Sequence, residues 1–190
     1  MNDTDTAEVL PPDDGHNRRL RDHVHPEAWA GRPAAGAYDL VAIGAGTAGL
    51  VASGGAALLG ARAALIERAY LGGDCLVTGC VPSKTLIASA KVAHTARRSA
   101  LFGVRTGPVE VDFAAVMERV RRVRADVARH DGAEGMRTRG VDVLFGTAKF
   151  TGPKSLDLDG TVQYARLSFA KGRPRLTPSS ASCDPSGGCC

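Results

Sequence analysis

Short apolar runs alternate with helix-like segments through the middle of this chain. Tyr38–Ile43 is an apolar run that stops at a glycine, as a buried parallel strand does. A helix is predicted over residues 47–59, with a polar start and apolar faces, and Ala61–Glu67 returns to the pattern of a strand. Strand, glycine turn, helix and strand within about 30 residues make a βαβ unit. The pattern therefore predicts an α/β domain.

Further elements are predicted downstream of this unit. Pro82 suits the first turn of a helix that continues through Lys84–Arg98. Asp112 has the position of an N-cap for a third helix, in which valines recur at helical spacing. Strands are expected at Val141–Phe145 and Ser155–Leu158, around a Gly-Pro turn. The opposite face of the third helix is expected to be solvated because it is rich in arginine: Arg119, Arg121, Arg122 and Arg124.

The two ends of the chain lack this patterning. Residues 1–36 are rich in Pro, Asp, Arg and His without sustained periodicity, which predicts a flexible N-terminal arm with a short helix around Asn17–His23. Residues 166–190 are rich in Pro, Ser and Gly, which predicts a disordered, low-complexity tail. The folded domain is therefore expected over residues 37–165.

Composition narrows the class of protein. With 190 residues, 44% of them hydrophobic and 23% charged, the chain suits one globular domain. The net charge of +4 comes from 24 basic and 20 acidic residues, and aromatic residues make up only 5%. A nucleic-acid interface needs a denser basic patch or stacking aromatic side chains, so we expect no nucleic-acid partner.

Targeting signals are not evident in the sequence. The N-terminus has no basic start followed by an apolar run, so no signal peptide is expected. The charge-free stretch Leu40–Ala61 is long enough for a membrane helix, but it is dominated by Ala and Gly and is only weakly hydrophobic. The cysteines are clustered, with Cys75 and Cys80 in the body and the others at the C-terminus, unlike a secreted disulfide framework. We therefore expect a cytoplasmic protein without a membrane span.

A glycine-rich segment follows the first predicted strand and opens the first predicted helix. In such a segment, Gly44 allows the tight turn, Gly46 lets the backbone approach a pyrophosphate, and Gly49 lets the helix pack closely on the strand. The N–H groups of the first helical turn and the helix dipole then face the phosphates. The full segment is Gly44, Ala45, Gly46, Thr47, Ala48 and Gly49, and it predicts a dinucleotide site in a Rossmann-like fold.

An acidic residue ends the second predicted strand. Glu67 can accept hydrogen bonds from ribose hydroxyl groups. It disfavours NADP because a 2′-phosphate would meet a negative charge. It leaves both NAD and FAD open as the bound dinucleotide.

Two cysteines five positions apart follow the βαβ unit. Cys75 and Cys80 could be buried apolar residues, half of a metal site or a redox pair, but no His or Cys pair in the body has spacing suited to complete a metal site. A disulfide needs Cα atoms about 4.4–6.8 Å apart, whereas five residues of regular helix rise about 7.5 Å. The turn must therefore be distorted, as Gly79 permits, and a strained bond of this kind is easily reduced. The helix start near Pro82 would favour a thiolate at Cys80.

The segment GGDCLVTGCVPSK, residues 72–84, resembles the active-site signature of the class I pyridine nucleotide-disulfide oxidoreductases. This family includes dihydrolipoamide dehydrogenase, glutathione reductase and mercuric reductase. The resemblance covers about residues 37 to 165 and is nearest to mercuric-reductase-like members. It implies a Rossmann-like FAD-binding domain with a redox-active disulfide.

The resemblance also implies roles for individual residues. Cys80 would be the charge-transfer thiolate against the flavin, and Cys75 the exchange thiol that attacks the substrate. In the family, a hydride passes from NAD(P)H to FAD, and the electrons then pass to the disulfide and to a small-molecule or metal-ion substrate. Full-length members are homodimers. FAD would be bound by the segment 44–49 and Glu67, by Gly73 and Asp74 near the pyrophosphate, by Lys84 near the flavin N5 edge, and by Ala148 near the adenine.

The chain also departs from the family pattern. Members are much longer, and neither a second glycine motif for NAD(P)H nor the dimerisation domain is found in this sequence. After Thr161 a member returns through a strand into an Ala-Thr-Gly turn, whereas this chain reads differently from Leu167 onward. The resulting hypothesis is a mercuric-reductase-like, FAD-dependent disulfide oxidoreductase that is truncated or frame-shifted here. The alternatives are an inactive flavin-binding remnant and a dihydrolipoamide dehydrogenase-like enzyme. Cys189 and Cys190 resemble the terminal cysteine pair of mercuric reductases, but are interpreted as a coincidence in an out-of-frame tail.

Overall fold

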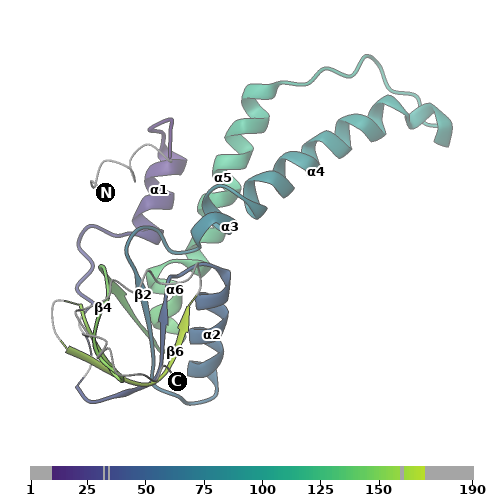
Figure 1. Ribbon diagram of the computed structural model, residues 1–190. Helices are drawn as coiled ribbons and strands as arrows, with labels where there is room; N and C mark the ends of the chain where they lie inside the picture. The colour runs from purple at the N-terminus through teal and green to yellow at the C-terminus, as the bar shows by residue number, and fades with distance from the viewer. Residues whose placement is uncertain (1–9, 32, 34, 159–160, 170–190) are drawn as a thin grey trace, which may run out of the picture.

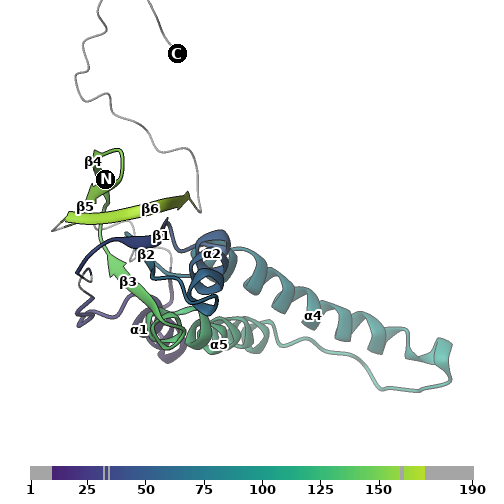
Figure 2. The ribbon, with the colours of Figure 1, turned by 90° about the horizontal axis from the view of Figure 1, so that it is seen from below.

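Six strands form one sheet in the order β3-β2-β1-β6-β5-β4 (Figures 1 and 2). The computed structural model describes residues 10–31, 33, 35–158 and 161–169. Strands β3, β2, β1 and β6 run parallel, and β5 and β4 continue the sheet antiparallel from β6. The strands are β1 (Tyr38–Ile43), β2 (Ala63–Glu67), β3 (Val141–Phe145), β4 (Lys149–Gly152), β5 (Ser155–Asp157) and β6 (Thr161–Phe169).

Helices cover one side of the parallel strands and extend beyond them. In Figure 1, α4 and the first part of α5 run away from the sheet, joined at their far end by a long connection. Helix α2 packs on β1 and β2, α6 on β3, and α1 on α5. The helices are α1 (Gly15–Val24), α2 (Thr47–Leu58), α3 (Gly73–Val77), α4 (Cys80–Arg97), α5 (Phe113–Asp131) and α6 (Ala133–Thr138), with a 3₁₀ turn, η2 (Ser99–Phe102).

Both faces of the parallel strands are buried. Ala42 and Leu65 belong to a cluster that packs against the helices. Val41 and Ile66, the next residues on the same strands, belong to a second cluster with side chains of β5 and β6. Because neighbouring side chains on a strand point to opposite faces, strands buried on both sides have the continuous apolar sequence seen here.

The predicted α/β class and several element boundaries are confirmed. β1 has the predicted bounds, and α5 begins after Asp112, whose Oδ1 accepts the Ala115 N–H at 3.0 Å. The charge-free stretch 40–61 forms most of β1, all of α2 and the turns around them. Within the described part of the chain, no helix has both the length and the apolar character needed to span a bilayer.

The N-terminal segment differs from the expected flexible arm. Its short helix is present as α1, and Leu20 and Val24 on that helix are fully buried in the helix-side cluster. The Leu71 N–H donates to the Val24 carbonyl at 3.1 Å, which ties the end of α1 to the body. The sequence did not reveal this packing because only two apolar residues, spaced i and i+4, face the core in an otherwise polar helix.

The returning strand after Thr161 also differs from expectation. Residues 166–169, which the sequence pattern assigned to the tail, continue β6 and pair in parallel with β1, with Phe169 opposite Ile43. The alternation of apolar and polar residues at Val162–Tyr164 is interrupted at Ala165 and resumes at Arg166–Phe169, shifted by one position. The remainder of the predicted tail, with Cys183, Cys189 and Cys190, lies outside the described residues.

Candidate functional site

The carboxyl ends of β1, β2 and β3 meet at one edge of the sheet, where open α/β sheets bind ligands. The chain leaves β1 through Gly44, which has a φ of 92° and whose N–H donates to the Ile66 carbonyl at 2.7 Å. The Gly146 N–H donates to the Glu67 carbonyl at 2.9 Å, so the turn after β3 is fixed to the end of β2. The predicted nucleotide-binding residues of the first two strands therefore share one edge.

The glycine loop leads directly into α2. Gly46 is the N-cap residue in an extended conformation, and no side chain caps the helix. A Cβ placed on Gly46 would meet no heavy atom of the described residues within 4 Å. Gly49 is buried, whereas Thr47 and Ala48 are exposed. The first turn of α2 is thus open to a phosphate group, which its N–H groups and dipole would stabilise.

Glu67 holds the glycine loop through its carboxylate. Oε2 accepts the Ala45 N–H at 2.7 Å, and Oε1 accepts the N–H groups of Arg68 and Ala69, each at 2.9 Å. A carboxylate has about four acceptor positions, so room for about one further donor remains. The expected role toward a ribose hydroxyl is compatible with this arrangement, but the carboxylate also has a structural role that the sequence did not indicate.

The cysteine segment lies against the glycine loop. The Gly72 N–H donates to the Ala45 carbonyl at 2.8 Å. A Cβ on Gly73, which has a φ of 53°, would lie 3.0 Å from the Gly46 Cα, so the two backbones are in close approach. Asp74 follows on the exposed side. Gly73 is therefore beside the open helix terminus, and the expected position of Gly73 and Asp74 near a pyrophosphate stays a prediction.

A sharp bend separates α3, which carries Cys75, from α4, which begins at Cys80. The Asp74 carbonyl accepts two N–H groups in this bend, from Thr78 at 3.0 Å and from Gly79 at 2.5 Å. A Cβ on Gly79 would lie 2.8 Å from the Asp74 carbonyl oxygen, so the bend requires glycine at this position. The distortion expected between the two cysteines is present.

The two thiols interact directly. Cys75 is half-buried, Cys80 is exposed, and neither is in a disulfide. Hydrogen bonds from the Cys80 thiol and the Thr47 hydroxyl lower the pKa of Cys75, with smaller contributions from the Cys80 N–H and the Lys84 charge. The Cys75 sulfur in turn raises the pKa of Cys80. The first negative charge of the pair is therefore favoured on Cys75.

This electrostatic order differs from the expectation that the helix start would favour a thiolate at Cys80. Cys80 is indeed the first residue of α4, but the Cys75 sulfur raises the pKa of Cys80 more than the Lys84 charge and the Cys80 N–H lower it. Cys75 also receives the hydroxyl of Thr47, the first residue of α2. The starts of two helices thus act on Cys75, as helix N-termini do on thiolates.

The remaining predicted residues are more loosely connected to this cluster. Lys84 is exposed on α4, and its charge lowers the pKa of both thiols. Ala148 follows β3 and packs against the second apolar cluster. Among the described residues, neither Lys84 nor Ala148 makes a hydrogen bond or ion pair that would indicate a role in nucleotide binding.

Two residues near the site were not among the predicted site residues. His25, from the segment after α1, contacts the Ala69 carbonyl through Nδ1 and packs its ring against Phe145, with centroids 4.4 Å apart. Arg124, assigned from its spacing to a solvated face, is buried against α3 and α1. Of the arginines assigned to that face only Arg122 is exposed, whereas Arg119 and Arg121 are half-buried. Arg124 lies four residues after the buried Val120, and that spacing is the signal that could have placed it on the buried face.

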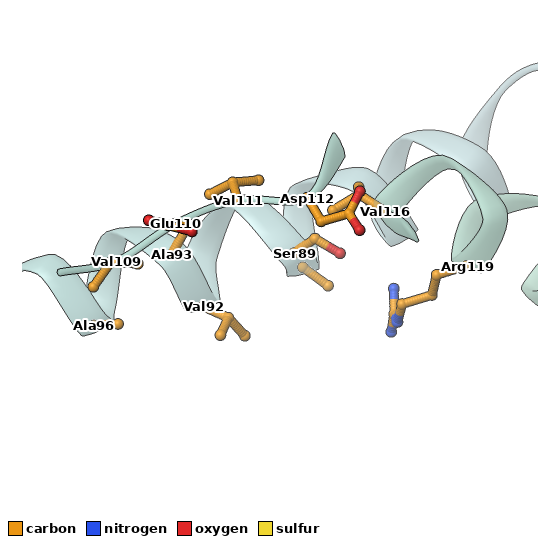
Figure 3. A pocket seen from close by; sticks show the side chains of 11 residues that line it. Ser89, Val92, Ala93, Ala96, Val109, Glu110, Val111, Asp112, Val116 and Arg119 are labelled. Atoms are coloured by element: carbon orange, nitrogen blue, oxygen red, sulfur yellow. The ribbon is translucent and has the colours of Figure 1, made fainter. Parts of the chain in front are cut away.

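A separate groove of about 360 Å³ runs along α4 (Figure 3). Its walls are Ala and Val side chains of α4 and the segment 109–112, with Arg119 and Asp112 at one end. It contains none of the predicted site residues.

Within the described ranges, no group of three or more His, Cys, Asp or Glu side chains is arranged to hold a metal ion.

A glycine loop at a helix start, an acid ending the second strand and an adjacent dithiol thus lie together at one edge of an α/β sheet. Residues 38–185 match the family model described as pyridine nucleotide-disulphide oxidoreductase. The chain belongs to this family, whose members are FAD-dependent oxidoreductases. The match extends beyond residue 165, where the resemblance seen in the sequence ended.

The chain is similar to proteins named dihydrolipoyl dehydrogenase and to proteins named mercuric reductase. A dihydrolipoyl dehydrogenase of Bacillus subtilis (strain 168) is 40% identical over 131 residues, which are 68% of this chain and 27% of the relative. A mitochondrial dihydrolipoyl dehydrogenase of Pisum sativum is 40% identical over 124 residues, 64% of this chain and 24% of the relative. A mercuric reductase of Lysinibacillus sphaericus is 30% identical over 129 residues, 68% and 24% respectively. The chain spans about a quarter of the length of these relatives.

Proposed function

We propose that this chain is the FAD-binding, dithiol-carrying part of a disulfide oxidoreductase. The observation that carries the proposal is the contact between the cysteine segment and the glycine loop, made by the Gly72 N–H and the Ala45 carbonyl at 2.8 Å. This contact joins a redox-type cysteine pair to a helix start that is open to phosphate. The cysteine segment would therefore form part of the site in which a dinucleotide binds.

The residues present fit the ADP half of FAD. The first N–H groups of α2 would bind the pyrophosphate, close to Gly73 and Asp74, and Glu67 would accept a ribose hydroxyl with its remaining acceptor position. Lys84 would stabilise negative charge near the flavin, and Ala148 would lie near the adenine. When bound, FAD supplies a two-electron carrier between a nicotinamide cofactor and the cysteine pair. In the proposed scheme, NAD(P)H binds to a part of the longer family protein.

Cys75 and Cys80 would alternate between a disulfide and two thiols. Two electrons and two protons convert the disulfide to the dithiol. A dithiol substrate would supply them and become a disulfide itself, and the pair would pass them on to the flavin, whereas Hg(II) would receive electrons from the dithiol. The lowered pKa of Cys75 supports its role as the exchange thiol in both directions, because a low pKa favours the attacking thiolate and also makes the sulfur a better leaving group. Cys80 would be the thiol that faces the flavin.

The identities of the relatives favour a dithiol substrate over a metal ion. Two dihydrolipoyl dehydrogenases are 40% and 41% identical to the chain, against 30% for a mercuric reductase. The signature segment had placed the chain nearest to mercuric-reductase-like proteins. We therefore propose a dihydrolipoamide-type disulfide exchange as the activity of the complete protein, with Hg(II) reduction as the second candidate.

A spectroscopic experiment tests the proposal on the full chain. The purified protein is titrated with FAD, reduced, and examined for a long-wavelength charge-transfer band, with Cys80→Ser and Cys75→Ser variants in parallel. FAD binding, with a band that Cys80→Ser abolishes and Cys75→Ser retains, supports the proposal. A protein that binds no FAD would refute it, and flavin binding without a band in any variant favours the inactive remnant.

A further inference from the structure

A buried arginine contacts the turn that separates the two cysteines. Arg124 of α5 is 8% exposed, and its Nη1 donates to the Val77 carbonyl at 2.7 Å. Its Nη2 donates to Oδ1 of Asn17 on α1 at 2.6 Å. Asn17 is itself fully buried and donates to the carbonyls of Leu10 and Pro12. One guanidinium thus connects α5, α1 and the end of the helix that carries Cys75.

The Val77 carbonyl needs such a donor because α3 ends there. In a continuous helix this carbonyl would accept the N–H of Val81, four residues later. The bend instead restarts the helix at Cys80, while the Asp74 carbonyl takes the N–H groups of Thr78 and Gly79. A buried carbonyl without a partner costs about 1–3 kcal/mol. Arg124 therefore supplies the bond that the bend removes.

The burial of Arg124 is not explained by an ion pair of its own. Desolvation and the charge of Arg121 lower its pKa, and only the charge of Asp14 opposes them. Asp14 itself pairs with Arg121, Nε to Oδ2, at 2.5 Å. The Nε of Arg124 has no partner among the described residues. Burying a cation on neutral acceptors is costly, so a well-packed apolar side chain would serve the core better.

We propose that Arg124 is a positioning residue for the Cys75–Cys80 pair, which it keeps within disulfide distance by stabilising the bend between α3 and α4. Without this bond, the Val77 carbonyl would regain a hydrogen-bond donor if α3 continued into α4 as one regular helix. A regular helix would separate Cys75 and Cys80 by about 7.5 Å along its axis, beyond the usual Cα range of a disulfide. Through Asn17, the same contact makes α1 a support of the redox turn. This inference rests on the proposed function, in which the pair cycles between dithiol and disulfide.

The test measures how readily the native protein closes the disulfide. All proteins carry Cys183→Ser, Cys189→Ser and Cys190→Ser, so that only the pair reacts. Each is equilibrated with glutathione: two protein thiols and one glutathione disulfide give the protein disulfide and two glutathione molecules. The equilibrium constant is measured under native conditions and in urea by trapping and mass spectrometry. Arg124→Met is compared with Arg122→Met, an exposed arginine on the same helix.

Arg124→Met is expected to lower the native equilibrium constant about tenfold, the size of one lost buried hydrogen bond. Arg122→Met is expected to match the reference, and all proteins are expected to agree in urea, where the turn is absent. Arg124→Lys keeps one donor for Val77 and is expected to lie within about threefold of the reference. If Arg124→Met does not fold, the comparison is made between Arg124→Lys and Asn17→Ala, and Asn17→Ala is expected to lower the equilibrium constant more than Arg124→Lys does.

Two results separate this inference from the proposed function. A folded Arg124→Met with the reference equilibrium constant overturns the positioning role and leaves the proposed function standing. If Arg124→Met does not fold, an Asn17→Ala protein that closes as readily as the reference overturns it in the same way. A reference protein that forms no Cys75–Cys80 disulfide overturns both.

Discussion

The carboxylate of Glu67 and the backbone N–H of Ala45 are joined by a hydrogen bond of 2.7 Å. This bond connects the end of β2 to the glycine loop that follows β1. It orients the loop whose next residues open α2, and it does so from the residue expected to contact the ribose. Formation of the loop and the proposed recognition of a nucleotide would therefore depend on the same side chain.

Glu67→Ala is expected to weaken both folding and FAD binding. Three N–H groups lose their acceptor, and a free energy of unfolding lower by about 2 kcal/mol is expected from groups that are partly accessible to water. FAD affinity is expected to fall at least about tenfold, the effect of one hydrogen bond. Urea denaturation and flavin fluorescence titration measure the two effects. Glu27→Gln, on an exposed residue, is the control, and an unchanged affinity in folded Glu67→Ala would contradict the assignment.

Gly46→Ala separates binding from stability. The added methyl group meets no described atom within 4 Å and Gly46 has a negative φ, so the fold should tolerate it. The same methyl group would occupy the space of a pyrophosphate, so FAD affinity is expected to fall at least about a hundredfold. The matched control is Gly55→Ala inside α2, which also meets no atom and is expected to raise stability by about 0.5–1 kcal/mol. Equal FAD affinities of the two variants would place the nucleotide elsewhere.

Thr47→Val is expected to shift the reactivity of Cys75 toward higher pH. The hydroxyl of Thr47 lowers the pKa of Cys75, so its removal raises that pKa and reduces the thiolate fraction below it. The rate of Cys75 alkylation by iodoacetamide, followed by peptide mass spectrometry across pH, is therefore expected to fall about threefold to tenfold near neutral pH. Thr47→Ser keeps the hydroxyl and should retain the reference profile. Identical profiles for Val and Thr would exclude this hydrogen bond.

Leu20→Ala tests whether α1 is part of the folded core. The side chain is fully buried, so its truncation is expected to cost about 2–5 kcal/mol of unfolding free energy. Arg18→Ala, on the exposed side of the same helix, is expected to change stability by less than about 0.5 kcal/mol. Thermal and urea denaturation measure both. Equal stabilities would show that the segment is the flexible arm the sequence suggested.

Local signals allowed much of the fold to be predicted. β1 and the glycine loop were recognisable because an apolar run, a glycine at positive φ and a helix start lie next to one another in the sequence. The Asp112 cap was recognisable because its partner, Ala115, is three residues away. Such features depend on neighbours within one or two turns.

The contacts that were missed depend on distant residues. Arg124 is buried by Asn17, 107 positions away, and by Val77, 47 positions away. Its own neighbourhood in sequence gives no indication of these two partners. The thiol order was missed for the same reason, because Thr47 reaches Cys75 only after the glycine loop and the cysteine segment have come together. Three-dimensional proximity, not residue type, determines these properties.

The pairing of β1 with β6 also has a consequence for biosynthesis. The strand that precedes the glycine loop lies between β2 and β6, and Ile43 has its partner Phe169 near the far end of the described chain. A nascent chain on the ribosome can pair β1 with β2 early, but it cannot complete the other side of β1 until β6 has left the exit tunnel. Contacts of such long sequence separation form slowly. The glycine loop, though made early in translation, therefore reaches its final form among the last parts of the sheet.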